Sequence, residues 1–132
     1  MKQIAGGVCA VNPEPLADFI DFFSLGEGEE STVEIVECYR TAKKEHWSKA
    51  RFLKAVSAIE GVYVPSFYEH SYNPDGTIAA ITPLEGAPQA VRKRIVQNMD
   101  TAYWPEKQIV PSTEIVHDRS NLEVFRGCIR GC

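Results

Sequence analysis

The stretch that decides the fold lies at positions 22–29 and reads FFSLGEGE. Its first half, up to Leu25, has the apolar character of a short buried strand. The glycines that follow indicate a tight turn, because glycine adopts backbone conformations that other residues avoid. Ser31 and Glu34 then have the spacing of a capping box, which predicts the start of a helix. Strand, glycine turn and helix in this order are typical of a parallel α/β fold.

The flanking residues extend this pattern over 2–62. The segment IAGGV at 4–8 is apolar and broken by glycines, as in a buried strand that runs into a loop. Asn12 and the prolines after it predict a helix that ends near Ile20. Two more helices are expected from apolar residues at helical spacing, the second of them starting near Ser48. The inward residues are Ile35, Val36, Tyr39 and Ala42 in the first, and Phe52, Leu53, Val56 and Ile59 in the second.

The second half of the chain predicts a β-hairpin followed by an extended connector. Residues 62–65 are strand-like, the NPDG sequence at 73–76 is a strong turn signal, and 77–81 suits the returning strand. Further prolines keep the residues after the hairpin out of long helices. We therefore divide the chain into an α/β region at 1–62, a hairpin and connector at 63–120, and a strand leading into a loop at 121–132.

Composition and charge restrict the classes of function. The 132 residues are 44% hydrophobic with a formal net charge of −4, which suits one soluble domain and not a general nucleic-acid binder. The basic run RKR at 92–94 is therefore interpreted as a solvated face. No apolar run is long enough for a membrane span or a secretory signal, so we expect no membrane partner and a cytoplasmic location. Cys9 and Cys38 are interpreted as buried, inert thiols.

The residues CIRGC at 128–132 contain the candidate metal ligands of the sequence. Cys128 and Cys132 are flanked by glycines and stand on one loop, so both can bind one soft metal centre. The glycines would let backbone amides approach the sulfur atoms. Arg126 and Arg130 would favour the thiolate, which is the form that binds metal.

Six short motifs together resemble radical SAM iron–sulfur proteins that carry an N-terminal B12-binding-like domain. They are GG at 6–7, NPEP at 12–15, GEGE at 26–29, IVPS at 109–112, VHDR at 116–119 and EVFRGCIRGC at 123–132. The resemblance implies a partial Rossmann-like, B12-binding-like parallel sheet at 1–62. It also implies the first strand and the start of the cluster loop of a radical SAM domain at 121–132. The chain would then be a fragment that ends inside a Cys-x3-Cys-x2-Cys motif.

The resemblance implies a reaction for the intact protein. Cys128 and Cys132 match two of three cysteines that hold a [4Fe–4S] cluster, at which S-adenosylmethionine is bound and cleaved reductively. The intact parent would be an Fe–S oxidoreductase, whereas the fragment alone is expected to be inactive and to hold no cofactor. Cobalamin is a further cofactor that the resemblance allows. The histidines at 46, 70 and 117 are not assigned as cobalt ligands, and those at 46 and 70 are expected at the surface.

Glycine turns give a candidate cofactor site. Doubly wound folds bind ligands at the carboxyl ends of their strands, where we expect these turns to lie. Glu27 and Glu29 also suit a metal or acid–base pair, or alternatively capping of the helix that follows. The candidate lining residues of the crevice are Gly6, Gly7, Gly26, Glu27 and Gly28.

Two other interpretations stay open. One is a small α/β binding module with incidental terminal thiols. The other is a metal or redox module in which Cys128 and Cys132 hold zinc or form a disulfide. The substrate is unknown in every case. A partial sheet would have an open strand edge, which predicts a homo-oligomer or strand exchange.

Overall fold

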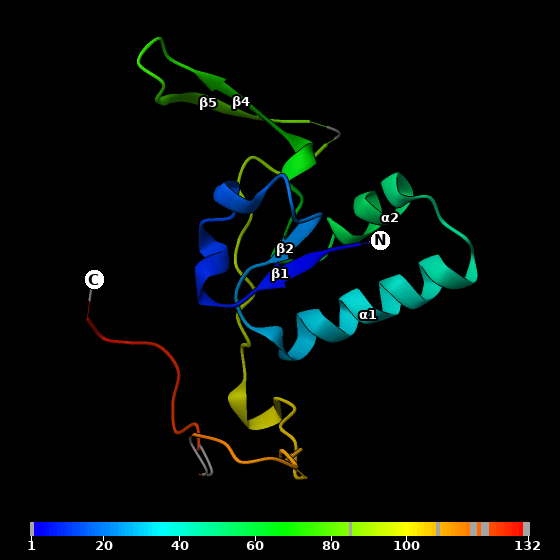
Figure 1. Cartoon of the computed structure of the whole chain (residues 1–132), viewed down its shortest axis with the longest axis vertical. Coiled ribbons are helices and arrows are strands. Elements are labelled where there is room, and N and C mark those ends of the chain that lie inside the picture. Colours follow the sequence, from blue (N-terminus) through cyan, green and yellow to red (C-terminus); the bar gives the residue numbers. More distant parts are fainter. Residues whose placement is uncertain (1, 85, 108, 117–118, 120–121, 131–132) are drawn as a thin grey trace.

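The computed structural model describes residues 2–84, 86–107, 109–116, 119 and 122–130. A mixed α/β unit occupies the first half of the chain, with a small sheet against two helices (Figure 1). A two-stranded hairpin projects from one end of this unit, and an extended connector then passes alongside it. The expected α/β class is therefore confirmed.

The main sheet has the strand order β1-β2-β3. β1 (Ile4–Gly6) and β2 (Phe22–Ser24) run parallel, whereas β3 (Val62–Tyr63) runs antiparallel to β2 on its other side. The parallel sheet predicted for 1–62 is thus found only for β1 and β2. Gly61, with φ at 89°, turns the chain so that β3 enters against β2 in the opposite direction.

The helix expected between β1 and β2 does not form. Two 3-10 turns take its place, η1 (Val8–Val11) and η2 (Glu14–Leu16). Pro13 and Pro15 lack a backbone N–H, so the chain closes only short turns here. The strand predicted directly afterwards is confirmed as β2.

Two helices, α1 (Gly28–Lys44) and α2 (Lys49–Val56), pack on one face of this sheet. α1 begins ahead of Ser31, the residue predicted as its cap. Ser31 is buried in the first turn, where its hydroxyl donates to Glu27 O at 2.9 Å. Acidic residues in this first turn favour the earlier start, because a helix N-terminus is electropositive. The start of α2 is as predicted, since the Ser48 hydroxyl accepts a backbone hydrogen bond at 3.2 Å.

The hydrophobic core fills the space between the sheet and the two helices. Phe22 of β2 packs edge to face against Phe52 of α2, with ring centroids 5.9 Å apart. Most residues predicted to point inward are buried here. These are Ile35 and Ala42 of α1 and Phe52, Leu53 and Val56 of α2.

The hairpin forms from β4 (Tyr68–Tyr72) and β5 (Ile78–Pro83) around the predicted turn at 73–76. Its first strand starts later than expected. Residues 62–63 belong to β3, and a separate 3-10 turn, η3 (Pro65–Phe67), lies between β3 and β4. The hairpin prediction is thus confirmed with a shifted first strand.

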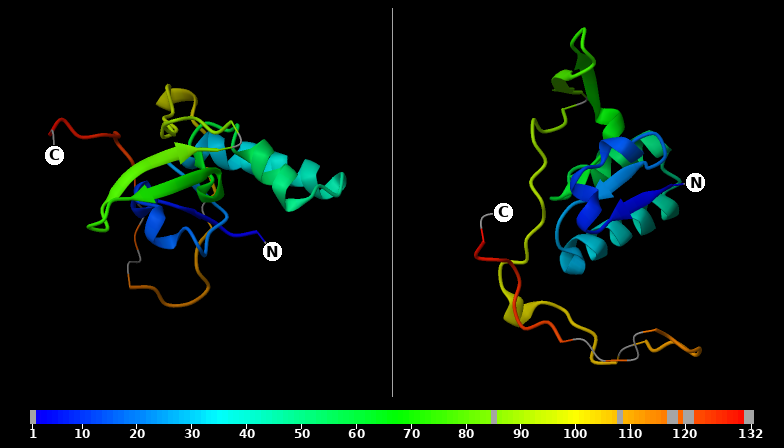
Figure 2. Two further views of the ribbon diagram at one scale, coloured as in Figure 1. Left: turned by 90° about the horizontal axis from the view of Figure 1, so that it is seen from above. Right: turned by 60° about the vertical axis from the view of Figure 1, so that its left-hand side comes forward.

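From residue 86 onward the described chain is extended, apart from the turn η4 (Met99–Thr101) (Figure 2). The extended connector is as predicted. The strand expected from 121 is not seen at 122–130, which is coil with no strand paired to it in the described part of the chain. A strand is stabilised by hydrogen bonds to a neighbouring strand, and this segment has none among those residues.

One carboxylate ties three elements together at the start of β2. Asp21 Oδ1 lies 2.5 Å from Lys49 Nζ of α2, and its Oδ2 accepts a hydrogen bond from Gln3 N at 2.9 Å. Burial acts to raise the pKa of Asp21. The hydrogen bonds from Lys49 and from Gln3 outweigh burial, and they hold this pKa below its ordinary value of 3.8.

Replacing this carboxylate tests the link. Asp21→Asn should lower the free energy of unfolding by about 1 kcal/mol at pH 7, because it leaves Lys49 without its ion pair. A lowered folded-state pKa stabilises only while the carboxylate is ionised, so the difference between variant and parent should vanish as pH falls through that pKa. Urea unfolding at several pH values measures this. Asp18→Asn, on an exposed residue, is the control, and a pH-independent loss for Asp21→Asn would contradict the assignment.

Candidate functional site

The turn between β2 and α1 is where distant parts of the chain meet. At Gly26 the connector crosses the turn, with Arg94 N donating to Leu25 O at 2.9 Å and Glu27 N donating to Arg94 O at 3.0 Å. Gly26 has a φ of 97°, and a Cβ placed on it would lie 2.6 Å from Arg94 N and closer still to Arg94 O. Only glycine fits here, for reasons of both conformation and space.

The side chain of Arg94 binds the first turns of α1. Its Nη2 lies 2.6 Å from Glu30 Oε2 and 2.8 Å from Glu34 Oε1, and only 15% of the side chain is exposed. The hydrogen bond that Arg94 donates to Glu30 raises the pKa of Arg94 further above its ordinary value. The run at 92–94 is therefore only partly the solvated face that we predicted. Arg92 and Lys93 are exposed, whereas Arg94 docks the connector onto α1.

Residues 122–130, which contain Cys128, are called the cysteine loop below. The connector and the cysteine loop both contact Glu27, at the start of α1. It is the N-cap residue of α1, although its side chain does not cap the helix. Instead, the Glu27 carboxylate accepts a hydrogen bond from Val96 N of the connector and pairs with Arg126, whose Nη1 is 3.4 Å away. Of the roles predicted for Glu27, the structure provides a helix cap, made by its backbone, whereas the pairing with Arg126 was not predicted.

Arg126 connects the cysteine loop to this turn. Its Nη2 pairs with Glu29 Oε1, while its Nε donates to Glu123 Oε1 at 2.6 Å. The hydrogen bond from Arg126 lowers the pKa of Glu29 and also that of Glu123. We expected Arg126 to favour the Cys128 thiolate, but its charge is shared among three carboxylates.

The backbone bends toward the sulfur atom at Cys128. Cys128 is an exposed free thiol, and Arg130 N donates to its Sγ at 3.4 Å. Gly127, with φ at 88°, bends the chain directly before it. Both features agree with the predicted role of glycine in bringing amides toward sulfur. Cys132 lies outside the described residues.

A single described cysteine does not make a complete metal site. Among the residues that the structure describes, no group of three or more His, Cys, Asp or Glu side chains could hold a metal ion. The predicted acid–base or metal pair, Glu27 and Glu29, therefore lacks a third ligand in that part of the chain. Both carboxylates contact Arg126 instead.

The remaining candidate cofactor residues lie at one edge of the sheet. Gly6 ends β1 beside Ser24, and Gly7 has no atom within 4 Å of a Cβ placed on it. Gly28 opens α1, close to Thr32 Oγ1. The two glycine turns thus follow the carboxyl ends of two parallel strands, as predicted, and the connector contacts the second turn at Gly26.

The histidines differ in their surroundings. His46 is exposed directly after α1, as predicted. The surface position predicted for His70 was wrong, because its side chain is only 14% exposed and its Nε2 lies 3.2 Å from Glu14 Oε2. Tyr63 OH donates to the same Glu14 carboxylate, and burial raises the pKa of Tyr63. His117 lies outside the described residues.

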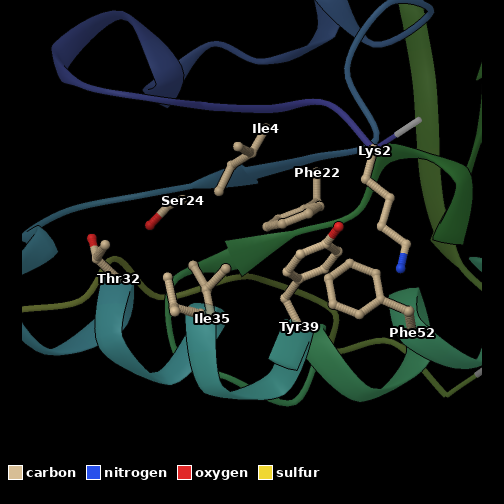
Figure 3. Close-up of a pocket in the computed structure, with 9 residues that line it drawn as sticks. Lys2, Ile4, Phe22, Ser24, Thr32, Ile35, Tyr39 and Phe52 are labelled. Atoms are coloured by element: carbon tan, nitrogen blue, oxygen red, sulfur yellow. The ribbon is translucent and has the colours of Figure 1, made fainter. Parts of the chain in front are cut away.

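An apolar cavity of about 500 Å³ that we did not predict lies between β1, β2 and the helices. Val36 and Tyr39 line it and are 48% and 45% exposed, although we predicted both to be buried. Lys2 Nζ lies 4.0 Å from the ring centroid of Phe52 and 5.0 Å from that of Tyr39 (Figure 3). The apolar residues at helical spacing in α1 predicted a buried face. Such periodicity alone does not distinguish a filled core from a cavity.

A substitution at Gly26 tests the close contact between this turn and the Arg94 backbone of the connector. Gly26→Ala should destabilise the protein by about 2–4 kcal/mol, because the methyl group meets Arg94 backbone and φ is positive. Gly76→Ala is the matched control, since Gly76 has φ at 84° but no atom within 4 Å of the new Cβ. Gly76→Ala should lower the free energy of unfolding by about 1 kcal/mol. Urea unfolding measures both, and equal losses would contradict the close packing.

Comparison with known proteins gives one match. Residues 3–65 match the family model described as the N-terminal part of radical SAM proteins. No curated protein and no solved structure matches the chain. The matched segment contains β1, β2, both helices, β3 and the turn to which the connector and the cysteine loop are bound. The match covers just under half of the chain and shows similarity to radical SAM proteins over that segment.

Proposed function

We propose that this chain is a piece of a radical SAM Fe–S oxidoreductase, from the end of its N-terminal domain to the start of its cluster loop. Cys128 and Cys132 would be two of the three cysteines that hold a [4Fe–4S] cluster in the intact protein. The proposal rests on one combined observation. A segment matching the N-terminal part of radical SAM proteins is joined, through Arg126, to a glycine-flanked Cys-x3-Cys sequence.

The residues around Cys128 fit a cluster ligand. Its Sγ is exposed and receives a backbone N–H, an interaction that stabilises sulfur carrying negative charge. When bound, the cluster supplies one electron that cleaves S-adenosylmethionine to methionine and a 5′-deoxyadenosyl radical. The part of this chain is to hold the thiolates, to bend the loop at Gly127 and to fix the start of the loop on α1.

The N-terminal region would be B12-binding-like, with cobalamin as a further cofactor of the intact protein. The parallel pair β1–β2, with a glycine turn after each strand, supports this fold. Gly6, Gly7, Gly26, Glu27 and Gly28 would border the cofactor edge, where the space beside Gly7 is open and the backbone of Arg94 lies against Gly26. Among the described residues, His46 follows α1 and His70 lies in the hairpin, so neither is assigned as a cobalt ligand.

The cellular setting follows from the same proposal. No helix within the described ranges is long and apolar enough to cross a membrane. We propose a cytoplasmic protein, because iron–sulfur ligation needs reduced thiols. Alone, the piece would be inactive and would hold no stable cluster, since a third cysteine is required. Its open β1 edge would favour pairing with a second copy.

Reconstitution of the full-length protein tests the proposal. The protein is loaded anaerobically with iron and sulfide, reduced and mixed with S-adenosylmethionine, and 5′-deoxyadenosine is measured. Formation should be abolished in Cys128→Ala and in Cys132→Ala. It should persist in Cys9→Ala, a matched control that removes another thiol, which is exposed although we predicted it to be buried.

Three outcomes would contradict the proposal. Folded protein that takes up no iron and forms no 5′-deoxyadenosine would favour a binding module with incidental thiols. Zinc, or a disulfide between Cys128 and Cys132, would favour a metal or redox module. Activity that survives both cysteine substitutions would place the cluster ligands elsewhere.

A further inference from the structure

We infer that Glu27 and Glu29, at the N-terminus of α1, position the cysteine loop by binding Arg126. These two carboxylates are called the α1 anchor below. The inference deepens the proposed function, on which it rests only for the role of Cys128. The docking of Arg126 stands on the contacts of this chain and is tested without any metal.

Arg126 is the residue of the loop that is held. In 122–130 it is the one residue that is not exposed. The large apolar side chains around it face solvent, and Phe125 and Ile129, for example, are 78% and 101% exposed. Because these apolar side chains are largely exposed, the ion pairs of the guanidinium group, which lies two residues before Cys128, are the contacts that fix this segment relative to α1.

The pairing is better shielded than an ordinary surface ion pair. The side chains of Arg126, Glu27 and Glu29 are 24%, 25% and 21% exposed. For comparison, Arg40 and Glu37, an ion pair further along α1, are 70% and 59% exposed. Exposed pairs contribute little because water screens them, so partial burial makes the anchor the stronger interaction of the two.

The α1 anchor is rigid independently of the loop. Glu27 N donates to Arg94 O at 3.0 Å, Glu27 O accepts from the buried Ser31 hydroxyl, and the Glu27 carboxylate accepts from Val96 N. Three groups of Glu27, its N–H, its C=O and its carboxylate, thus make four interactions, one of which is the pairing with Arg126. A binding group that is already fixed loses little conformational entropy when its partner arrives.

The loop orients its own arginine. Glu123, three residues before Arg126, accepts from Arg126 Nε at 2.6 Å and from Nη2 at 2.8 Å. This two-point pairing fixes the plane of the guanidinium and directs its other side toward Glu29 and Glu27. Glu27, Glu29 and Glu123 are therefore positioning residues for Cys128, and none of them is a ligand.

Trypsin measures the docking directly, because it cleaves after arginine and needs the side chain free. Glu29→Gln should raise the initial rate of cleavage after Arg126 by roughly three- to tenfold, with Glu27→Gln acting in the same direction. Cleavage after Arg92, an exposed connector residue, is the internal reference and should not change. Mass spectrometry of early time points gives both rates.

Two variants control for fold and charge. Glu37→Gln removes a carboxylate from the same helix, away from the α1 anchor, and should leave cleavage after Arg126 unchanged. Arg126→Lys keeps the cleavage site and the charge but loses the two-point geometry, so its rate should lie above that of the parent. An unchanged rate in folded Glu29→Gln would overturn the docking, as would an equal increase in Glu37→Gln.

The effect on the cluster ligand is measured separately in the reconstituted full-length protein. Glu29→Gln should broaden the electron paramagnetic resonance signal of the reduced cluster relative to Glu37→Gln, because the loop then samples more positions. An identical signal in both variants would overturn the positioning role. Faster cleavage after Arg126 in a protein that takes up no iron would retain the docking and reject the proposed function, so the two failures are distinguishable.

Discussion

Backbone atoms of Arg94 lie directly against the Cα of Gly26, and this contact joins the connector to the α/β unit. A side chain at 26 would separate the two segments, and the hydrogen bonds on either side of the contact would then break. The Arg94 side chain would leave Glu30 and Glu34, and Val96 would leave Glu27. The α1 anchor for Arg126 keeps its orientation through those same bonds. The contacts of Arg94, Val96 and Glu27 therefore all depend on a glycine, which has no Cβ, at position 26.

Electrostatics explains why so many acidic residues gather at the start of α1. The unpaired N–H groups of a helix N-terminus favour nearby anions, so Glu29 and Glu30 stabilise the helix where they stand. The same carboxylates are then available to bind arginines from outside the helix. Arg94 forms ion pairs with Glu30 and Glu34, and Arg126 forms ion pairs with Glu27 and Glu29. The two arginines use different carboxylates, so the connector and the cysteine loop do not compete for partners.

Local signals in the sequence predicted the elements that depend on local chemistry. The Ser48 cap, the turn at 73–76 and the strand that became β2 formed as expected, and the approach of a backbone amide to Cys128 also agrees. The direction and partner of β3 depend on a pairing with β2 that no short pattern records. Arg94 stood in a basic run typical of solvent-exposed faces, and its glutamate partners lie 60 and 64 positions away. Ion pairs between residues so far apart leave no repeating pattern in the sequence from which they could be predicted.

The distance in sequence between Arg126 and Glu29, 97 positions, has a consequence for the order of folding. α1 and its core can form from short-range contacts, which close quickly and at small entropic cost. The cysteine loop leaves the ribosome long after α1 and then meets a surface that is already folded. Until that moment its thiols have no defined place relative to the rest of the chain. Under the proposed function, assembly of a metal centre on this loop would then depend on the earlier folding of α1.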